Sequence, residues 1–154
     1  MKQILIVPSP VGPLTLTQED QALTGLHFGE HPQQGAEGST PLPEEAARQL
    51  EEYFAGQRKE FSLPLAPKGT EFQLRVWQAL LQIPYGETRS YGELAAMVGN
   101  PKACRAVGGA NHRNPLSILI PCHRVVGTKG SLTGYAGGLA VKEFLLKLES
   151  EARP

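Results

Sequence analysis

The chain has 154 residues, of which 19% are charged and 40% hydrophobic, and this length can bury roughly two-thirds of the unfolded surface in one domain or two small ones. Its two cysteines, Cys104 and Cys122, form no CxxC pair, which excludes a disulfide framework and fits a reducing compartment. The 15 basic and 15 acidic residues cancel, but residues 68–154 hold 11 basic and 6 acidic residues against 4 and 9 in residues 1–67, a bias that suits a polyanionic substrate or attraction between the halves.

Residues 1–67 are predicted to form an N-terminal α+β domain that contains a small antiparallel sheet and one helix. Apolar and β-branched residues alternate or cluster between proline and glycine residues, as they do in short strands. The three segments with this pattern are residues 2–7, 13–17 and 23–28.

The rest of this part is predicted to be a loop over residues 29–43, a helix over 44–54, a short strand over 60–63 and a linker over 64–69. The helix has one apolar face and ends before Gly56. That face consists of Ala46, Ala47, Leu50, Tyr53 and Phe54.

Residues 68–154 are predicted to be mostly helical, so the fold class is α+β. Thr70 and Gln73 form a capping-box pattern ahead of a helix that runs up to Pro84. Its buried stripe is predicted to be Phe72, Val76, Trp77, Leu80 and Leu81, with Trp77 in the core.

Residues 91–98, a Gly99-Asn100-Pro101 turn and residues 102–110 are predicted to form a helix-turn-helix. The second helix is rich in small residues, namely Ala103, Ala106, Gly108, Gly109 and Ala110. Small residues are poor helix formers, but they let a backbone approach a DNA groove or pack tightly against another helix. Arg105 is the long side chain of this helix, and an arginine in such a place is ordinarily a solvated charge.

The segment around Cys122 is the strongest chemical signal. Residues 118–120 are predicted to be a buried strand that ends at Pro121, because proline has no N–H for a ladder. A free thiol has a pKa of roughly 8.5, so Cys122 needs a base, and His123 can supply it directly or through one water. Arg124, Lys129 and Lys142 would make the site electropositive if the fold brings them close. The alternative is a buried, unreactive Cys122 beside an ordinary surface histidine.

Residues 72–149 resemble the alkylguanine-DNA alkyltransferases, or methylated-DNA:protein-cysteine S-methyltransferases. The resemblance covers about half of the chain, and the Pro-Cys-His-Arg core makes it specific. Related proteins that only bind damage carry tryptophan where Cys122 stands, so the chain resembles a reacting member. The matching motifs are Ser90-Tyr91, Gly99-Asn100-Pro101-Lys102, Arg105-Ala106-Val107-Gly108-Gly109-Ala110, Asn114-Pro115, Ile120-Pro121-Cys122-His123-Arg124-Val125-Val126 and Gly137-Gly138-Leu139-Ala140-Val141-Lys142.

The resemblance implies a catalytic set. Glu149 would orient His123, which through water deprotonates Cys122, and the thiolate would take the alkyl group from the exocyclic oxygen of guanine. Tyr91 would give the leaving guanine a proton, and Asn114 would support the turn before Cys122. From the residues alone, Asn114 could equally be an ordinary turn residue, and Glu149, near the end of an amphipathic helix, would be predicted to be solvated.

The resemblance also implies a DNA-binding set and a base pocket. Arg105 would fill the space left by a flipped base, Tyr91 would crowd the adjacent phosphate, and Ala103, Ala106 and Gly108 would lie in the minor groove. The pocket would be lined by Pro121, Val125, Tyr135 and Ala136. Many members carry serine where this chain has Ala136, so the preference among alkyl groups, and between guanine and thymine lesions, stays open.

The expected partner is double-stranded DNA that contains alkylated guanine, and the reaction would be irreversible and single-turnover. We expect no cofactor and no metal, because residues 1–67 contain no cysteine and His27 with His31 cannot complete a tetrahedral site. We expect no membrane partner and a cytoplasmic protein, since the apolar stretch before Pro8 is too short for a span or signal peptide. We also expect a monomer. Cooperative binding on DNA stays open.

Two other classes remain compatible with these motifs. A thiol hydrolase would also need Cys122 and His123, but it would turn over and would not need a helix-turn-helix. A DNA-binding regulator would need the helix-turn-helix but no nucleophile. Mass measurement after incubation with methylated DNA separates the three classes.

Overall fold

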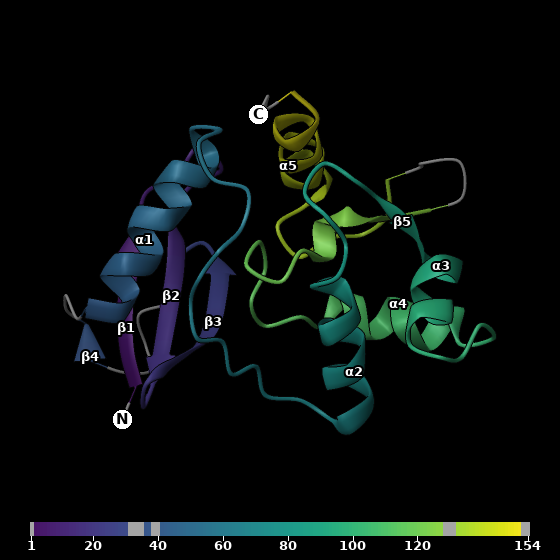
Figure 1. Cartoon of the computed structure of the whole chain (residues 1–154). Coiled ribbons are helices and arrows are strands. Elements are labelled where there is room, and N and C mark those ends of the chain that lie inside the picture. The colour runs from purple at the N-terminus through teal and green to yellow at the C-terminus, as the bar shows by residue number, and fades with distance from the viewer. Residues whose placement is uncertain (1, 31–35, 38–40, 128–131, 152–154) are drawn as a thin grey trace. The chain divides into compact units, whose positions relative to one another are not determined.

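The computed structural model describes residues 2–30, 36–37, 41–127 and 132–151 (Figure 1). The chain divides into two compact units, of which the first ends at Pro67 and the second spans Lys68–Glu151. A small sheet with one long helix makes up the first unit, and the second is mostly helical. The predicted α+β class is therefore confirmed.

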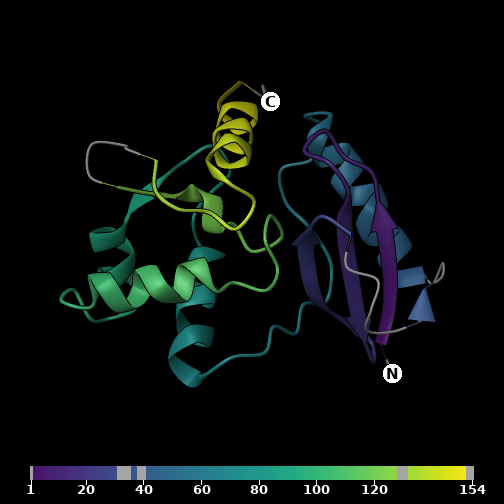
Figure 2. The same cartoon turned by 180° about the vertical axis from the view of Figure 1, so that it is seen from behind.

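The sheet of the first unit is built from β1 (Lys2–Val7), β2 (Leu14–Glu19) and β3 (Ala22–Phe28), which pair antiparallel in that order. Apolar side chains at alternate positions point into the core, as the period of two predicts. Leu14, Leu16 and Leu26 are fully or almost fully buried. The helix of this unit, α1 (Pro41–Phe54), covers one face of the sheet, as the front and back views show (Figure 1, Figure 2).

Two predictions between the sheet and α1 are wrong. Within the predicted loop over residues 29–43, β4 (Ala36–Glu37) pairs in parallel with β1, so the sheet is not wholly antiparallel. Helix α1 (Pro41–Phe54) also begins three residues before the predicted start. Its prolines fall in the first turn, where the missing N–H has no helical partner anyway. Two paired residues are too few to give β4 a detectable pattern.

No strand forms over residues 60–63. The side chain of Gln49, which is 2% exposed, takes the backbone N–H of Ser62 at 3.0 Å, so a helix side chain replaces a strand partner. Pairing comes slightly later, because Leu23 donates to the Pro64 carbonyl at 2.9 Å and accepts from Ala66 at 2.8 Å. This single bridge between Leu23 and Leu65 fastens the linker to the sheet of its own unit.

The second unit begins with α2 (Glu71–Leu80), and the predicted capping box is confirmed. Thr70 accepts from the Gln73 N–H at 3.1 Å, and the Gln73 side chain accepts from the Thr70 N–H at 3.0 Å. Trp77 is 2% exposed, and its indole N–H donates to the Ala110 carbonyl at 2.8 Å. Leu81 was expected in the buried stripe but is 42% exposed, because it follows the last helical turn.

Helices α3 (Tyr91–Met97) and α4 (Cys104–His112) pack against each other and against α2. A second capping box starts α3, where Ser90 and Glu93 exchange hydrogen bonds. Gly99 ends it with φ 84°, a left-handed conformation that glycine adopts without strain. Helix α4 begins two residues after the predicted start, since residues 100–103 still form a turn.

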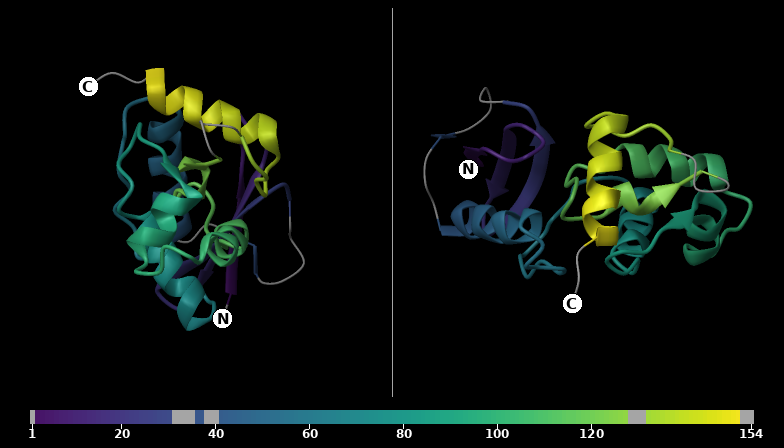
Figure 3. Two further views of the ribbon diagram at one scale, coloured as in Figure 1. Left: turned by 90° about the vertical axis from the view of Figure 1, so that its right-hand side faces the viewer. Right: turned by 90° about the horizontal axis from the view of Figure 1, so that it is seen from above.

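The remaining segments of this unit frame Cys122. Strand β5 (Arg89–Ser90) pairs in parallel with β6 (Val125–Val126), which follows the short helix η1 (Cys122–Arg124). Helix α5 (Leu139–Glu151) packs against η1, and its run through the second unit is visible in two further views (Figure 3). The parallel pair brings the start of α3 beside the segment that carries Cys122.

The strand predicted over residues 118–120 is wrong, although the segment is buried as expected. Ile118 has φ 73°, and Ile120 donates back to the Leu116 carbonyl at 2.8 Å, so the chain folds into a tight turn. A β-branched residue is unfavourable in this region of φ and persists only where its surroundings hold it. An apolar run alone does not distinguish a buried turn from a buried strand.

Candidate active site

Cys122 is the first residue of η1 and is 3% exposed. Asn114, at the end of α4, holds the preceding turn from both sides. Its amide donates to the Ile120 carbonyl at 2.8 Å and accepts from the Leu116 N–H at 3.0 Å. Asn111 adds a longer bond of 3.4 Å to the carbonyl of Cys122. The position of the thiol is therefore fixed relative to α4.

The surroundings of the thiol act in both directions on its charge. Burial raises the pKa of Cys122, whereas hydrogen bonds from Asn114 and Ser117 and the charge of Lys142 lower it. Lys142, in the first turn of α5, is fully buried, and burial lowers its own pKa while the Cys122 sulfur raises it. The predicted electropositive surroundings thus reach the thiol through Lys142. Lys129 lies outside the described residues.

His123, Arg124 and Glu149, of which the first two directly follow Cys122 in the chain, form a buried cluster. The imidazole Nε2 lies 2.7 Å from Glu149 Oε2, and Arg124 binds both carboxylate oxygens, at 2.8 and 3.0 Å. Arg124 also donates to the Ile83 carbonyl at 2.7 Å and lies 5.6 Å from the centre of the Tyr85 ring. Glu149 is 3% exposed, so the expectation of a solvated side chain from helix position alone is wrong.

The contacts within this cluster determine the protonation states of Glu149 and His123. Burial by itself would raise the pKa of Glu149, but its hydrogen bonds and charge interactions with His123 and Arg124 outweigh burial and lower the pKa to about 2. Burial lowers the pKa of His123, so its imidazole is neutral. An ionised Glu149 accepts hydrogen bonds only, which places the imidazole proton on Nε2. The other nitrogen, Nδ1, is buried without a partner among the described residues, and it is free to take a proton.

Stability of the second unit should therefore fall in acid. The lowered pKa of Glu149 stabilises the fold above the ordinary value of 4.5, and this contribution is lost as pH falls towards 2. At neutral pH it amounts to about 3 kcal/mol, and the lowered pKa of His123 acts in the same direction. Urea unfolding monitored by Trp77, the single tryptophan, measures this between pH 7 and 3. An equally steep loss in Glu149→Gln would contradict the assignment.

Tyr91 opens α3 and is half-buried. Its phenol is hydrogen-bonded to the hydroxyl of Thr133. Gly108 lies against its ring, since a Cβ at that glycine would sit 3.6 Å from the ring carbon Cδ1. The first turn of α3, the middle of α4 and the segment before α5 therefore meet at Tyr91.

The predicted DNA-binding residues lie on the outer side of α4. Arg105 and Ala106 are exposed, and Ala103 and Gly108 are half-buried. Gly109 is also exposed, with nothing within 4 Å of an added Cβ. Of these small residues, Gly108 packs against the Tyr91 ring of α3, whereas the buried face of α4 consists of Val107, Ala110 and Asn111.

The residues predicted to line the base pocket differ in their burial. Pro121, Val125 and Tyr135 are buried around Cys122, whereas Ala136 is exposed. Burial raises the pKa of Tyr135, and so do the charge and hydrogen bond of the Cys122 sulfur beside it. Its phenol is therefore neutral and lies next to the Cys122 thiol.

Three residues of the site carry more weight than the sequence indicated. Arg124 and Lys142 were recognised only as nearby charges, and Thr133 was not singled out. No local pattern distinguishes a buried arginine or lysine from an exposed one. The capping box at Ser90 and Glu93 was also missed, although its S-x-x-E spacing was detectable.

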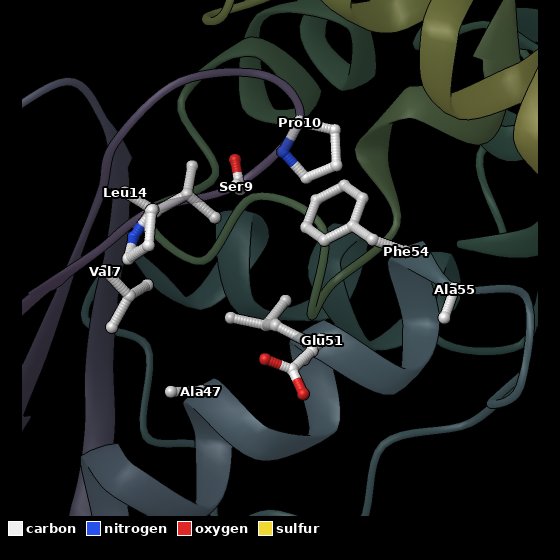
Figure 4. Close-up of a pocket in the computed structure, with 10 residues that line it drawn as sticks. Val7, Ser9, Pro10, Leu14, Ala47, Glu51, Phe54 and Ala55 are labelled. Atoms are coloured by element: carbon white, nitrogen blue, oxygen red, sulfur yellow. The ribbon is translucent and has the colours of Figure 1, made fainter.

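Other candidate centres offer less chemistry. A cavity of about 550 Å³ lies between α1 and the residues that join β1 to β2 (Figure 4). Its lining is largely apolar, with Glu51 as the charged member.

Among the described residues, no three His, Cys, Asp or Glu side chains cluster as metal ligands, and His31 lies outside them. In the same part of the chain, no helix is both long and apolar enough to cross a membrane.

The comparisons with known proteins agree with this geometry. Residues 71–151 match the DNA-binding domain of 6-O-methylguanine DNA methyltransferase, and residues 4–67 match its ribonuclease-like domain. Methylated-DNA-protein-cysteine methyltransferase from Methanosarcina acetivorans is 55% identical over 150 residues, covering 94% of this chain and 96% of that protein. The constitutive enzyme of Bacillus subtilis is 51% identical, covering 92% and 91%.

Solved structures are similar over the whole chain. The crystal structure of Mycobacterium tuberculosis O6-methylguanine methyltransferase has a TM-score of 0.92 at 47% identity, covering 100% of this chain and 96% of that one. Mycobacterium tuberculosis OGT in complex with DNA has a TM-score of 0.92 at 48% identity, covering 99% and 95%.

The fold and the buried Cys122, next to a carboxylate-held imidazole, define a protein that uses a cysteine nucleophile. With the sequence matches along both units, the chain belongs to the 6-O-methylguanine DNA methyltransferase family.

Proposed function

We propose that the chain repairs DNA directly, by irreversible single-turnover transfer of an alkyl group from the exocyclic oxygen of guanine to Cys122. The observation that carries this proposal is the position of Cys122 beside His123, whose Nε2 is held 2.7 Å from Glu149. Residues 68–154 form the DNA-binding and alkyl-transfer domain, and residues 1–67 form a separate α+β domain. Thymine alkylated on oxygen is a second substrate class that the same chemistry serves.

The catalytic steps use the protonation pattern of the cluster. His123 Nδ1 takes the thiol proton through one water, while Glu149 and Arg124 fix the ring and its tautomer. The thiolate attacks the alkyl carbon, guanine departs, and Tyr91 supplies a proton to it. Asn114 keeps the sulfur in place, and Pro121, Val125, Tyr135 and Ala136 line the base pocket. No cofactor or metal takes part in these steps.

The DNA partner is bound through α3 and α4, which act as a helix-turn-helix. The exposed small residues of α4, with Ala103 and Gly108, approach the minor groove closely. Chemistry on a stacked base requires its extrusion, at a cost of a few kcal/mol. Arg105 fills the gap in the stack, and Tyr91 crowds the neighbouring phosphate. The protein acts as a cytoplasmic monomer. Titration of DNA with the protein distinguishes cooperative binding of several copies from independent binding.

The proposal is tested by mixing purified protein with duplex DNA that contains O6-methylguanine and measuring intact protein mass and peptide masses. The expected result is one methyl group per molecule on Cys122, stoichiometric with repaired guanine. Repeated turnover would favour a thiol hydrolase, and DNA binding without a mass increase would favour a regulator. Methyl found on Cys104, which is an exposed free thiol, would show that the nucleophile is misassigned.

Arg105→Ala should slow repair of duplex DNA by roughly 10- to 100-fold, because the extruded base loses support worth a few kcal/mol. Reaction with free alkylguanine base needs no extrusion and should keep its rate. Arg75→Ala, an exposed arginine on α2, is the matched control. Equal slowing on both substrates would mean that Arg105 acts on the thiol or the fold.

Transfer should also destabilise the protein. Cys122 is 3% exposed, so a methyl group on its sulfur crowds a closed site, and overpacking costs about 1–3 kcal/mol. The thioether also loses the charge interaction with Lys142. Thermal unfolding of unreacted, methylated and benzylated protein should give successively lower midpoints. A midpoint that is unchanged or raised across this series would show that the site has room for the product.

A further inference from the structure

Thr133 links two ionisable groups of the second unit, Tyr91 and Lys142, and the charge of Lys142 interacts with the Cys122 sulfur. Its hydroxyl is hydrogen-bonded to the phenol of Tyr91 on α3. Lys142 on α5 donates to the same hydroxyl at 3.2 Å and to the carbonyl of Thr133 at 3.3 Å. One short side chain therefore connects the beginnings of α3 and α5.

The direction of this chain of hydrogen bonds follows from the groups themselves. The ammonium of Lys142 has hydrogens to give and no acceptor, so the Thr133 oxygen must accept from it. The Thr133 hydroxyl hydrogen is then available to the Tyr91 oxygen, and the Tyr91 hydrogen is available to a third group. This series of hydrogen bonds runs from Lys142 through Thr133 to Tyr91 and ends on the phenol of Tyr91 as a donor.

The charges of Lys142 and of the Cys122 sulfur support the same direction of proton transfer. Lys142 is fully buried and forms no ion pair with a carboxylate among the described residues; its charge interacts with the sulfur of Cys122. When Cys122 becomes a thioether, that interaction ends, and an ammonium left there would be a buried charge without a counter-ion. Loss of one proton from Lys142 removes this penalty.

We propose that Thr133 is a positioning residue that carries a proton from Lys142 to Tyr91 during alkyl transfer. The inference rests on the proposed function. The sulfur–carbon bond forms as the carbon–oxygen bond of the guanine breaks, and guanine keeps the electron pair. Tyr91 gives its proton to guanine, Thr133 gives its own to Tyr91, and Lys142 gives one to Thr133. The thiolate and the ammonium are both neutral at the end, so charge balances within the site.

The test compares Thr133→Val, which has the shape of threonine without the hydroxyl, with Thr133→Ser, which keeps the hydroxyl. Proton transfer by a positioned group contributes roughly 10²–10⁴-fold, and Thr133→Val should slow single-turnover repair by at least about tenfold at saturating DNA. Thr133→Ser should recover most of that loss. Thr88→Val, an exposed threonine of the same unit, is the matched control and should react at the wild-type rate.

Two further measurements distinguish proton transfer through Thr133 from a purely structural role of this residue. In a Cys104→Ser background, which removes the exposed thiol, alkylation of Cys122 by iodoacetamide releases iodide and needs no proton, so Thr133→Val should leave that rate within about twofold of the value without it. In a Tyr91→Phe background the relay has no end point, and Thr133→Val should add less than about a twofold loss. Thr133→Ala repeats the comparison if the valine variant fails to fold.

Three outcomes would overturn the proposal: wild-type repair by the valine and alanine variants, parallel slowing with iodoacetamide, or full additivity with Tyr91→Phe. The wild-type reaction is the internal reference. If unmodified protein takes no methyl group from DNA, the proposed function fails; if it does and the variants match it, the relay alone fails.

Discussion

Cys122→Ser should abolish methyl acceptance, with a rate loss on the order of 10⁴-fold or more, as when a catalytic nucleophile is removed elsewhere. A serine hydroxyl is far less acidic than a thiol, and a neutral, buried His123 is too weak a base to ionise it. The fold should persist, because serine fills nearly the same volume and Asn114 holds the turn independently. The measurement is intact mass after incubation with O6-methylguanine duplex, together with binding of the same duplex.

Cys104→Ser is the matched control. Cys104 is exposed at the start of α4, so this variant should accept methyl at the wild-type rate. The assignment would be wrong if the two variants behaved alike, or if Cys122→Ser lost DNA binding along with transfer. The latter result would mean that the thiol supports the structure of the DNA-binding surface.

Arg124→Met should produce the largest loss of stability in the second unit. It leaves Glu149 ionised and 3% exposed without its bidentate arginine, while His123 and the Gly86 N–H still contact the carboxylate. Removing one partner of a buried ion pair costs about 3–5 kcal/mol. Urea unfolding followed by Trp77 fluorescence reports on this unit, since the indole lies in its core against the Ala110 carbonyl.

The double variant Arg124→Met, Glu149→Gln tests the cause. Because the uncompensated charge is gone, it should be more stable than Arg124→Met alone. Arg75→Met, which removes an exposed arginine 5.8 Å from the Phe72 ring centre, should change stability by less than about 1 kcal/mol. A double variant no more stable than the single one would assign the loss to packing of the Arg124 stem against Tyr85.

The acid-induced loss predicted for Glu149 and the loss in Arg124→Met have one origin. In both cases the ion pair between Arg124 and Glu149 is lost, in acid through protonation of the carboxylate and in the variant through removal of the guanidinium. The same cluster therefore contributes to stability and holds the imidazole that we propose as the base for the thiol. His123 is fixed by the same carboxylate that Arg124 stabilises, so a change in either partner should alter both stability and transfer.

Local patterns in the sequence were enough for the elements that depend on neighbouring residues. Thr70 and Gln73 identified the start of α2 because a capping box is complete within four residues. The period of two identified β1, β2 and β3, and Cys122 beside His123 predicted a nucleophile with its base. The resemblance of the motifs supplied the family, which the comparisons then established independently.

Tertiary structure decided what depends on residues far apart in the chain. Glu149 is 26 residues from His123, and nothing in its helical neighbourhood shows that Arg124 and His123 will surround it. Ile118 adopts a left-handed turn because Asn114 and the backbone of Leu116 hold its ends. Lys142 and Tyr91 meet at Thr133 because β5 pairs with β6 and α5 packs on η1. Long-range pairing of this kind is chosen by packing and by the satisfaction of buried polar groups, which local propensity does not encode.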